Sequence, residues 1–257
     1  MKTTIYEYNI LQKLAENNDL FAIKQLVKYY FYKEKVNSEI IPLKNETLLH
    51  YLNVLIENKD SDAMLELGAL YYSGDNEIVE QNYEKAMFLY NEAVNNKSLD
   101  FSIECNSNVL NNLGYCYLYG RDNKQDYEKA FYYFAKATFF GNPNAMYKIG
   151  DMYKYGNFVE KDNNAALYWY KKTLSYSEED DYVFASVSFR LAQEYFYGDG
   201  TEASLFKSFK YLQIAEKRFY SLAINKHILS NTVFVNEPLK KVQDLLDKVR
   251  VKLNSKI

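Results

Sequence analysis

The side chains best suited to catalysis are few and scattered. The chain has two histidines, His50 and His227, and two cysteines, Cys105 and Cys116. Neither histidine lies near a nucleophile motif, so a Cys-His or Ser-His arrangement has no local support. We therefore expect no catalytic residues and no enzyme activity. The alternative is an enzyme whose site assembles from distant residues, with His50 or His227 beside a carboxylate in a deep pocket.

Metal and cofactor chemistry has no support either. The cysteines are eleven positions apart and match no C-x-x-C spacing, and no His/Cys/Asp cluster has ligand spacing. The glycines follow neither of the two common phosphate-binding patterns. We expect no cofactor and no metal, and free buried thiols in a reducing compartment, with one disulfide as the alternative. The acidic run "EEDD", Glu178 to Asp181, is interpreted as a solvated turn, or alternatively as a docking site for a basic partner.

Composition narrows the class of protein. With 31 basic and 34 acidic residues the net charge is −3, which does not favour a nucleic-acid partner. The first twenty residues have no apolar export segment, and no stretch approaches about 18 uninterrupted apolar residues, so we expect a cytoplasmic protein with no membrane contact. The chain has 48% apolar residues but only three prolines and nine glycines, a composition typical of long packed helices.

One spacing of apolar, small, tyrosine and glycine residues occurs four times. It comprises Leu67-Gly68, Tyr71 and Gly74; Leu113-Gly114, Tyr117 and Gly120; Ile149-Gly150, Tyr153 and Gly156; and Leu191-Ala192, Tyr195 and Gly198. Residues three to four apart share one helix face, so each set predicts a helix that ends at its last glycine.

A second helix is predicted downstream in each set. A small residue follows, and four positions later a bulky apolar one, in the pairs Ala86 and Tyr90, Ala130 and Phe134, Ala166 and Tyr170, and Ser208 and Leu212. We expect the first small residue to let the second helix approach closely and to meet the small residue on that helix. Since such a unit cannot bury its apolar face alone, successive units must stack.

These units resemble Sel-one-like repeats, the variable-length relatives of tetratricopeptide repeats. The best match is "NAMYKIGDMYKYGNFVEKDNNAALYWY", Asn144 to Tyr170, although Ala165 stands where the family usually has lysine. The resemblance implies an all-α fold, a right-handed α/α superhelical solenoid with capping helices. It also implies a non-enzymatic protein-interaction scaffold or adaptor; a bacterial immunity or regulatory protein that neutralises one dedicated toxin or enzyme is the alternative.

The predicted organisation is a single solenoid domain over residues 1–257. Residues 1–60 would form a degenerate repeat as the N-terminal cap, 61–217 four Sel-one-like repeats, and 218–257 the C-terminal capping helices. In the last of these, Asn236 is a candidate N-cap that places Pro238 in the first turn.

If the units pack like tetratricopeptide repeats, positions on each first helix point into a concave groove. Aromatic rings mixed with amides suit the binding of an extended peptide. We expect a protein or peptide partner there, with Asp151 and Lys154 setting charge preference, and a monomer or weak homodimer. The predicted partner-binding residues are Tyr72, Asn108, Asn111, Tyr115, Asn144, Tyr147, Asp151, Lys154, Phe189, Gln193 and Phe196.

Overall fold

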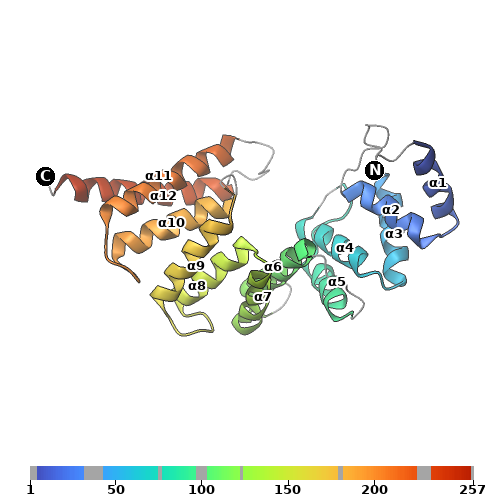
Figure 1. The fold of residues 1–257 in the computed structure, drawn as a ribbon, viewed down its shortest axis with the longest axis horizontal. Helices are drawn as coiled ribbons and strands as arrows, with labels where there is room; N and C mark the ends of the chain where they lie inside the picture. Colours follow the sequence, from blue (N-terminus) through green and yellow to red (C-terminus); the bar gives the residue numbers. More distant parts are fainter. Residues whose placement is uncertain are drawn as a thin grey trace. The chain divides into compact units, whose positions relative to one another are not determined.

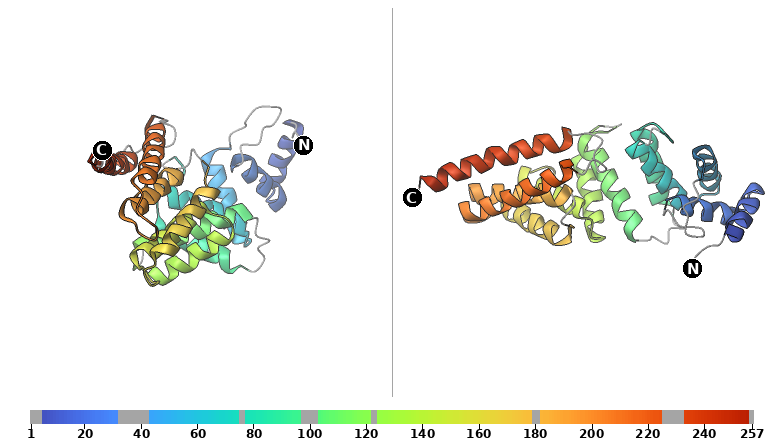
Figure 2. Two further views of the ribbon diagram at one scale, coloured as in Figure 1. Left: turned by 60° about the vertical axis from the view of Figure 1, so that its left-hand side comes forward. Right: turned by 90° about the horizontal axis from the view of Figure 1, so that it is seen from above.

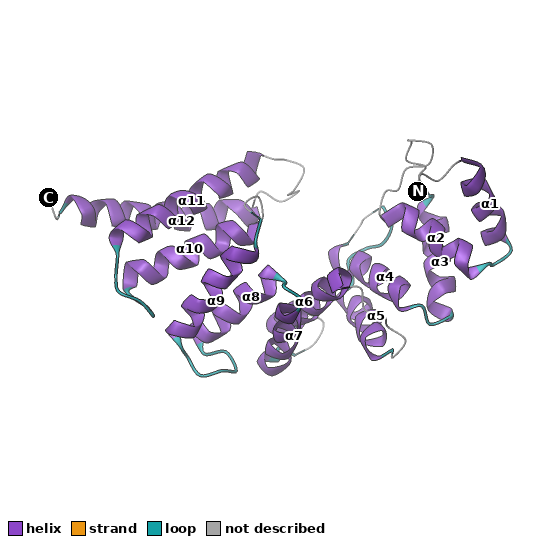
Figure 3. Cartoon of the chain, viewed as in Figure 1, coloured by secondary structure: helices purple, strands orange, loops and turns teal. Residues whose placement is uncertain are grey.

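The computed structural model describes residues 5–31, 43–74, 77–96, 103–121, 124–178, 182–224 and 233–255, with the backbone alone at 103–106 and 233–234. The regular structure of these residues is helical (Figure 3). It comprises twelve helices. They are α1 (Ile5–Glu16), α2 (Leu20–Phe31), α3 (Asn45–Glu57), α4 (Ser61–Ser73), α5 (Tyr83–Asn95), α6 (Ile103–Tyr119), α7 (Tyr127–Phe139), α8 (Pro143–Tyr155), α9 (Asn163–Tyr176), α10 (Tyr182–Tyr197), α11 (Leu205–Ile224) and α12 (Val233–Asn254).

The chain divides into two compact units. The first comprises residues 1–105 with 121–123, and the second comprises 106–120 with 124–257. In the first unit, α1 packs on α2, α2 on α3, α3 on α4 and α4 on α5. In the second unit, α8 packs on α9 and α10 on α11, and α12 lies along α11 (Figures 1 and 2).

The helices begin and end at residues suited to those positions. Six of them start after an Asp or Asn whose side chain accepts a hydrogen bond from a backbone N–H of the first turn: Asp19, Asp60, Asn82, Asp126, Asn142 and Asp162. The last glycine of each repeated set directly follows α4, α6, α8 or α10, and all four have positive φ. The predicted ends of the four first helices are therefore confirmed.

The first glycine of each set makes room for a ring. A Cβ added to Gly68, Gly114 or Gly150 would lie 2.7, 2.6 or 2.7 Å from the ring of Tyr90, Phe134 or Tyr170. The expected partner, the small residue one turn earlier on the second helix, is not the nearest group. The missing side chain of each glycine leaves room for a buried aromatic ring of the second helix, which is larger than the methyl group of the expected alanine.

The fourth repeat changes both partners of this contact. Ala192 replaces the glycine and Leu212 replaces the ring, and both are fully buried in one apolar cluster of the second unit. An aliphatic side chain leaves space that a Cβ can fill, so the two changes compensate each other.

The C-terminal helix begins earlier than predicted. It runs from Val233 to Asn254 and contains Pro238 in its interior, so the assignment of Asn236 as its N-cap is wrong. Val235 is 1% exposed and belongs to the apolar cluster that also holds Val242 and Leu246. The additional turn buries Val235, which outweighs the hydrogen bond that the proline cannot donate.

Candidate functional site

The predicted binding residues lie on four helices. Tyr72 is on α4 of the first unit, where its ring packs edge-on against Tyr83. The other ten belong to the second unit. They are Asn108, Asn111 and Tyr115 on α6; Asn144, Tyr147, Asp151 and Lys154 on α8; and Phe189, Gln193 and Phe196 on α10.

Several of these side chains already make contacts within the protein. Asn108 is exposed, and its side-chain oxygen Oδ1 accepts a hydrogen bond from the side-chain amide Nδ2 of Asn142 at 3.1 Å. Asn111 is buried on α6, and Asn144 is half-buried in the first turn of α8. Phe189 is buried in the C-terminal apolar cluster, and Phe196 packs against that cluster with Lys252 over its ring. These phenylalanines therefore hold the last helices together and leave little ring surface for a partner.

Asp151 is the centre of a polar cluster between α8, α9 and α10. Its Oδ1 accepts hydrogen bonds from the Tyr170 hydroxyl and from Arg190 Nε, both at 2.8 Å. Arg190 Nη1 also donates to Gln193 Oε1 at 3.2 Å. Burial, reinforced by the Asp151 carboxylate, raises the pKa of Tyr170, which stays a neutral hydrogen-bond donor. The carboxylate therefore joins two successive repeats.

Tyr147 lies beside this cluster on α8. Its ring packs against Tyr170, with 6.2 Å between the ring centroids, and the Arg190 guanidinium lies 5.8 Å from its centroid. Burial and the nearby Asp151 carboxylate raise the pKa of Tyr147. The structure thus brings Tyr147, Asp151 and Gln193 together around a residue absent from the prediction, Arg190.

Lys148 is the second residue that the sequence reasoning missed. Its ammonium nitrogen lies 5.5, 6.0 and 4.8 Å from the ring centroids of Tyr115, Tyr119 and Tyr147. Tyr115 and Tyr119 stack on each other one turn apart on α6. The ammonium is 3.6 Å from Asp151 Oδ2, a longer distance than the 2.8 Å contact of Arg190 with Oδ1. The residues next to Lys148 in the sequence form no recognisable binding motif. Two of the three rings near its ammonium belong to α6, so the local sequence does not reveal these surroundings.

A small cavity opens beside Lys148. Its volume is about 190 Å³, and it lies between the end of α6, the start of α7 and the end of α8. Lys148 and Asp151 supply its charged groups, and Gln125 and Asn157 add amides. Its other lining residues are Leu118, Tyr119, Tyr127, Met152 and Tyr155. The cavity can hold a side chain that accepts hydrogen bonds from an ammonium group.

Lys154 is occupied by a different ion pair. Its Nζ lies 2.8 Å from Glu194 Oε1 and 2.6 Å from Asp199 Oδ2. Glu194 is fully buried, and burial raises the pKa of its carboxyl although the lysine opposes this. Lys154 thus compensates a buried carboxylate on α10. Among the described residues, the Lys148 ammonium by contrast has only the 3.6 Å polar contact with Asp151 Oδ2 and a hydrogen bond that it donates to the Tyr119 hydroxyl at 3.4 Å.

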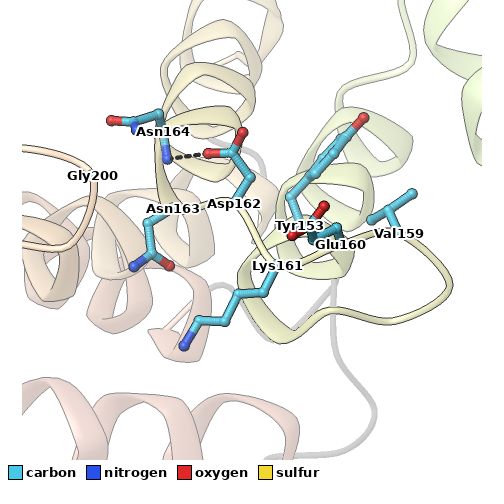
Figure 4. A pocket seen from close by; sticks show the side chains of 8 residues that line it. All are labelled: Tyr153, Val159, Glu160, Lys161, Asp162, Asn163, Asn164 and Gly200. Atoms are coloured by element: carbon cyan, nitrogen blue, oxygen red, sulfur yellow. Dashed lines mark hydrogen bonds between the residues drawn. The ribbon is translucent and has the colours of Figure 1, made fainter.

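A wider cavity of about 710 Å³ lies along the loop between α8 and α9 (Figure 4). Val159, Glu160 and Lys161 of that loop line it, together with Gly200 from the turn after α10. Asp162 accepts the backbone N–H of Asn164 at 2.8 Å and so begins α9 at this edge. The charges here are exposed and of both signs, so this cavity selects no ligand class.

The remaining candidates for chemistry stay apart. His50 is exposed on α3, while His227 and residues 179–181 of the acidic run lie outside the described residues. Cys116 is buried on α6, and the side chain of Cys105 is outside the described set. Over the described ranges, no three His, Cys, Asp or Glu side chains are placed to hold a metal ion. None of the helices in this part of the chain is long and apolar enough to cross a membrane.

Comparison with known proteins places the repeats in a family. The family model described as "Sel1 repeat" matches residues 61–98, 107–138, 143–174 and 185–218. A comparison with curated protein sequences gave no significant match.

Solved structures show the same fold. A Sel1 repeat protein from Oxalobacter formigenes is similar with a TM-score of 0.57 and 18% identity, over 90% of this chain and 88% of that one. The protective antigen c5321 of uropathogenic Escherichia coli, which displays an SLR fold, gives a TM-score of 0.53 and 19% identity. The alignment covers 93% of this chain and 56% of that longer one. The four matched segments span more than half of the sequence, and the chain belongs to the Sel1 repeat family.

Proposed function

We propose that this chain is a non-enzymatic scaffold that binds a segment of another protein on the first helices of its second unit, with an acidic side chain of that segment contacting Lys148. Sel1 repeat proteins are generally protein-interaction scaffolds. The observation that carries the finer proposal is the position of the Lys148 ammonium, which lines a cavity of about 190 Å³ and lies over three tyrosine rings.

Charge supports an acidic partner. Lys148 and Asp151 line the cavity, and Arg190, which lies outside its lining, pairs with Asp151 at 2.8 Å, so the three side chains together carry one net positive charge. Arg190 and Tyr170 already donate to Asp151 at 2.8 Å, so the carboxylate depends little on the more distant Lys148. A carboxylate of the partner would neutralise this net positive charge. It would also accept a hydrogen bond from the Lys148 ammonium, which is already partly desolvated.

The aromatic surroundings favour a protein ligand. Tyr119 and Tyr155 line the cavity with large ring surfaces and hydroxyl groups, the combination enriched at protein interfaces. Rings held by packing lose little conformational entropy on binding, so a short extended segment gains contact area cheaply. Tyr115, Tyr147 and Gln193 would contribute at the edges of this contact.

The test is selection of binders from a phage library of random dodecapeptides with the purified chain, followed by titration of the enriched peptides. We expect peptides enriched in Asp and Glu. We also expect Lys148→Gln to weaken their binding at least about tenfold, the usual effect of losing one charge-assisted hydrogen bond.

The matched control is Lys171→Gln, an exposed lysine on α9 whose loss changes net charge equally. It should leave binding within about twofold. Enriched peptides without acidic residues, or equal losses in both variants, would contradict an acidic contact at Lys148. If no peptide were enriched by a folded chain, the peptide-binding proposal itself would fail.

A further inference from the structure

An aromatic stripe runs along the exposed side of α7 in the second unit. Residues three or four positions apart share this face: Glu128, Phe131, Tyr132, Ala135, Lys136 and Phe139. Together with Phe158 they line a groove of about 530 Å³. Phe139 is 86% exposed and Tyr132 is 51% exposed. We refer to these seven residues as the α7 stripe.

The loop after α8 adds to the stripe at a conformational cost. Phe158 has a φ of 69°, a left-handed conformation that non-glycine residues rarely adopt, and its side chain remains 53% exposed. Its ring lies against Phe131, with the centroids 5.6 Å apart. The strained backbone keeps the Phe158 ring in solvent, where it enlarges the exposed apolar surface. Backbone strain and large exposed apolar patches are both common at binding sites.

The charges on the stripe are arranged symmetrically. Glu128 lies four positions before Tyr132 and Lys136 lies four positions after it. Both are exposed, and neither forms an ion pair with another described residue. If two copies of α7 cross antiparallel with a two-fold axis at Tyr132, each Glu128 faces the Lys136 of the other copy. Such self-complementarity is what an isologous interface requires.

The geometry points to a second copy of this chain as the occupant of the α7 stripe. Phe139 and Phe158 would be buried at the outer parts of the interface, and the small side chain of Ala135 lets the helices approach closely. A helix of 13 residues is about 20 Å long, so the contact is smaller than a standard interface of about 1,600 Å². The dimer is therefore weak and forms only at high protein concentration.

Charge reversal tests the pairing directly. Analytical ultracentrifugation of the full chain should show the average mass rising above 30.3 kDa as concentration increases from low micromolar to near millimolar. Glu128→Lys or Lys136→Glu alone should abolish this rise, because each places like charges opposite one another. The double variant, and an equimolar mixture of the two single variants, should regain it.

Two variants control for net charge alone. Glu92→Lys and Lys171→Glu change the charge by the same amounts at exposed positions outside the stripe, and should associate like the original chain. Circular dichroism verifies that each variant is folded. A chain that stays monomeric throughout, single reversals that still associate, or a double variant that does not recover would each overturn the proposal. This readout is independent of Lys148, so it is separate from the test of peptide binding.

Discussion

Gly200 has very little room around it. Its φ is 65°, and a Cβ built there would overlap the backbone carbonyl oxygen of Asn163. A backbone atom at the start of α9 cannot move aside as a side-chain end can. The residue thus allows the turn after α10 to approach the helix of the preceding repeat.

Gly200→Ala should lower the free energy of unfolding by more than about 2 kcal/mol, since it combines left-handed strain with a clash. Urea denaturation measures the loss. Gly141→Ala is the matched control, because φ is 81° there but the nearest atom to a new Cβ is a Tyr176 ring carbon at 3.5 Å. It should cost about 1 kcal/mol; equal losses in both variants would contradict the close approach at Gly200.

Glu66 makes the stability depend on pH. Burial raises its pKa to about 7 from 4.5, and the charge of Asp62, which Lys24 holds at 2.9 Å, adds to the shift. Between pH 4.5 and 7 the folded state keeps a proton that the unfolded state has lost. The free energy of unfolding contributed by Glu66 is therefore full below pH 4.5 and falls as pH rises through this window.

Glu66→Gln should remove this decline, which amounts to at most about 1.4 kcal/mol per pH unit. Urea denaturation of both chains across the window gives the difference between their slopes. Parallel slopes would show that Glu66 titrates alike in the folded and unfolded states.

At the scale of helices, ion pairs connect the first helices of successive repeats. Asp151 with Arg190, and Lys154 with Glu194, both join α8 to α10. The second pair includes a fully buried carboxylate, so loss of the lysine would leave an uncompensated charge or force the carboxylate to take up a proton.

Lys154→Met should consequently lower the free energy of unfolding by about 3 kcal/mol, with part of the loss recovered in the double variant Lys154→Met/Glu194→Gln. Thermal and urea unfolding provide the measurement. Lys161→Met, an exposed position in the following loop, serves as control and should change stability by less than about 0.5 kcal/mol. A loss no larger than that of the control would refute the compensating role of Lys154.

At the scale of the whole molecule, the second unit offers two different surfaces. The cavity beside Lys148 is small and combines one lysine and one aspartate with amides and tyrosine rings, whereas the α7 stripe is a wider groove lined mainly by exposed aromatic rings. A small cavity with charged groups can accommodate one polar side chain. A broad apolar stripe instead favours a partner that covers a large apolar area. The two proposed binding surfaces therefore differ in chemistry, and the second unit carries both.

The repeat architecture could be predicted because it depends on residues close in sequence. Helix ends at Gly156 and its three counterparts recur in all four repeats, and a bulky apolar residue follows four positions after a small residue in each of them. Local hydrogen bonding and left-handed geometry determine these features, so the residue types alone reveal them. Asn236 does not begin α12, because the burial of Val235, which depends on tertiary packing, extends the helix beyond that residue.

The sequence by itself determined the helical class and the four repeats. Only the tertiary structure decided which charged side chains pair with one another: Asp151 is paired with Arg190, 39 positions away, and Lys154 with Asp199, 45 positions away. Tertiary packing likewise places the Lys148 ammonium beside the rings of Tyr115 and Tyr119 on α6, a contact that no local sequence pattern predicts. Pairings between repeats depend on how whole helices pack and which rotamers that packing allows, and these emerge only when the chain is folded.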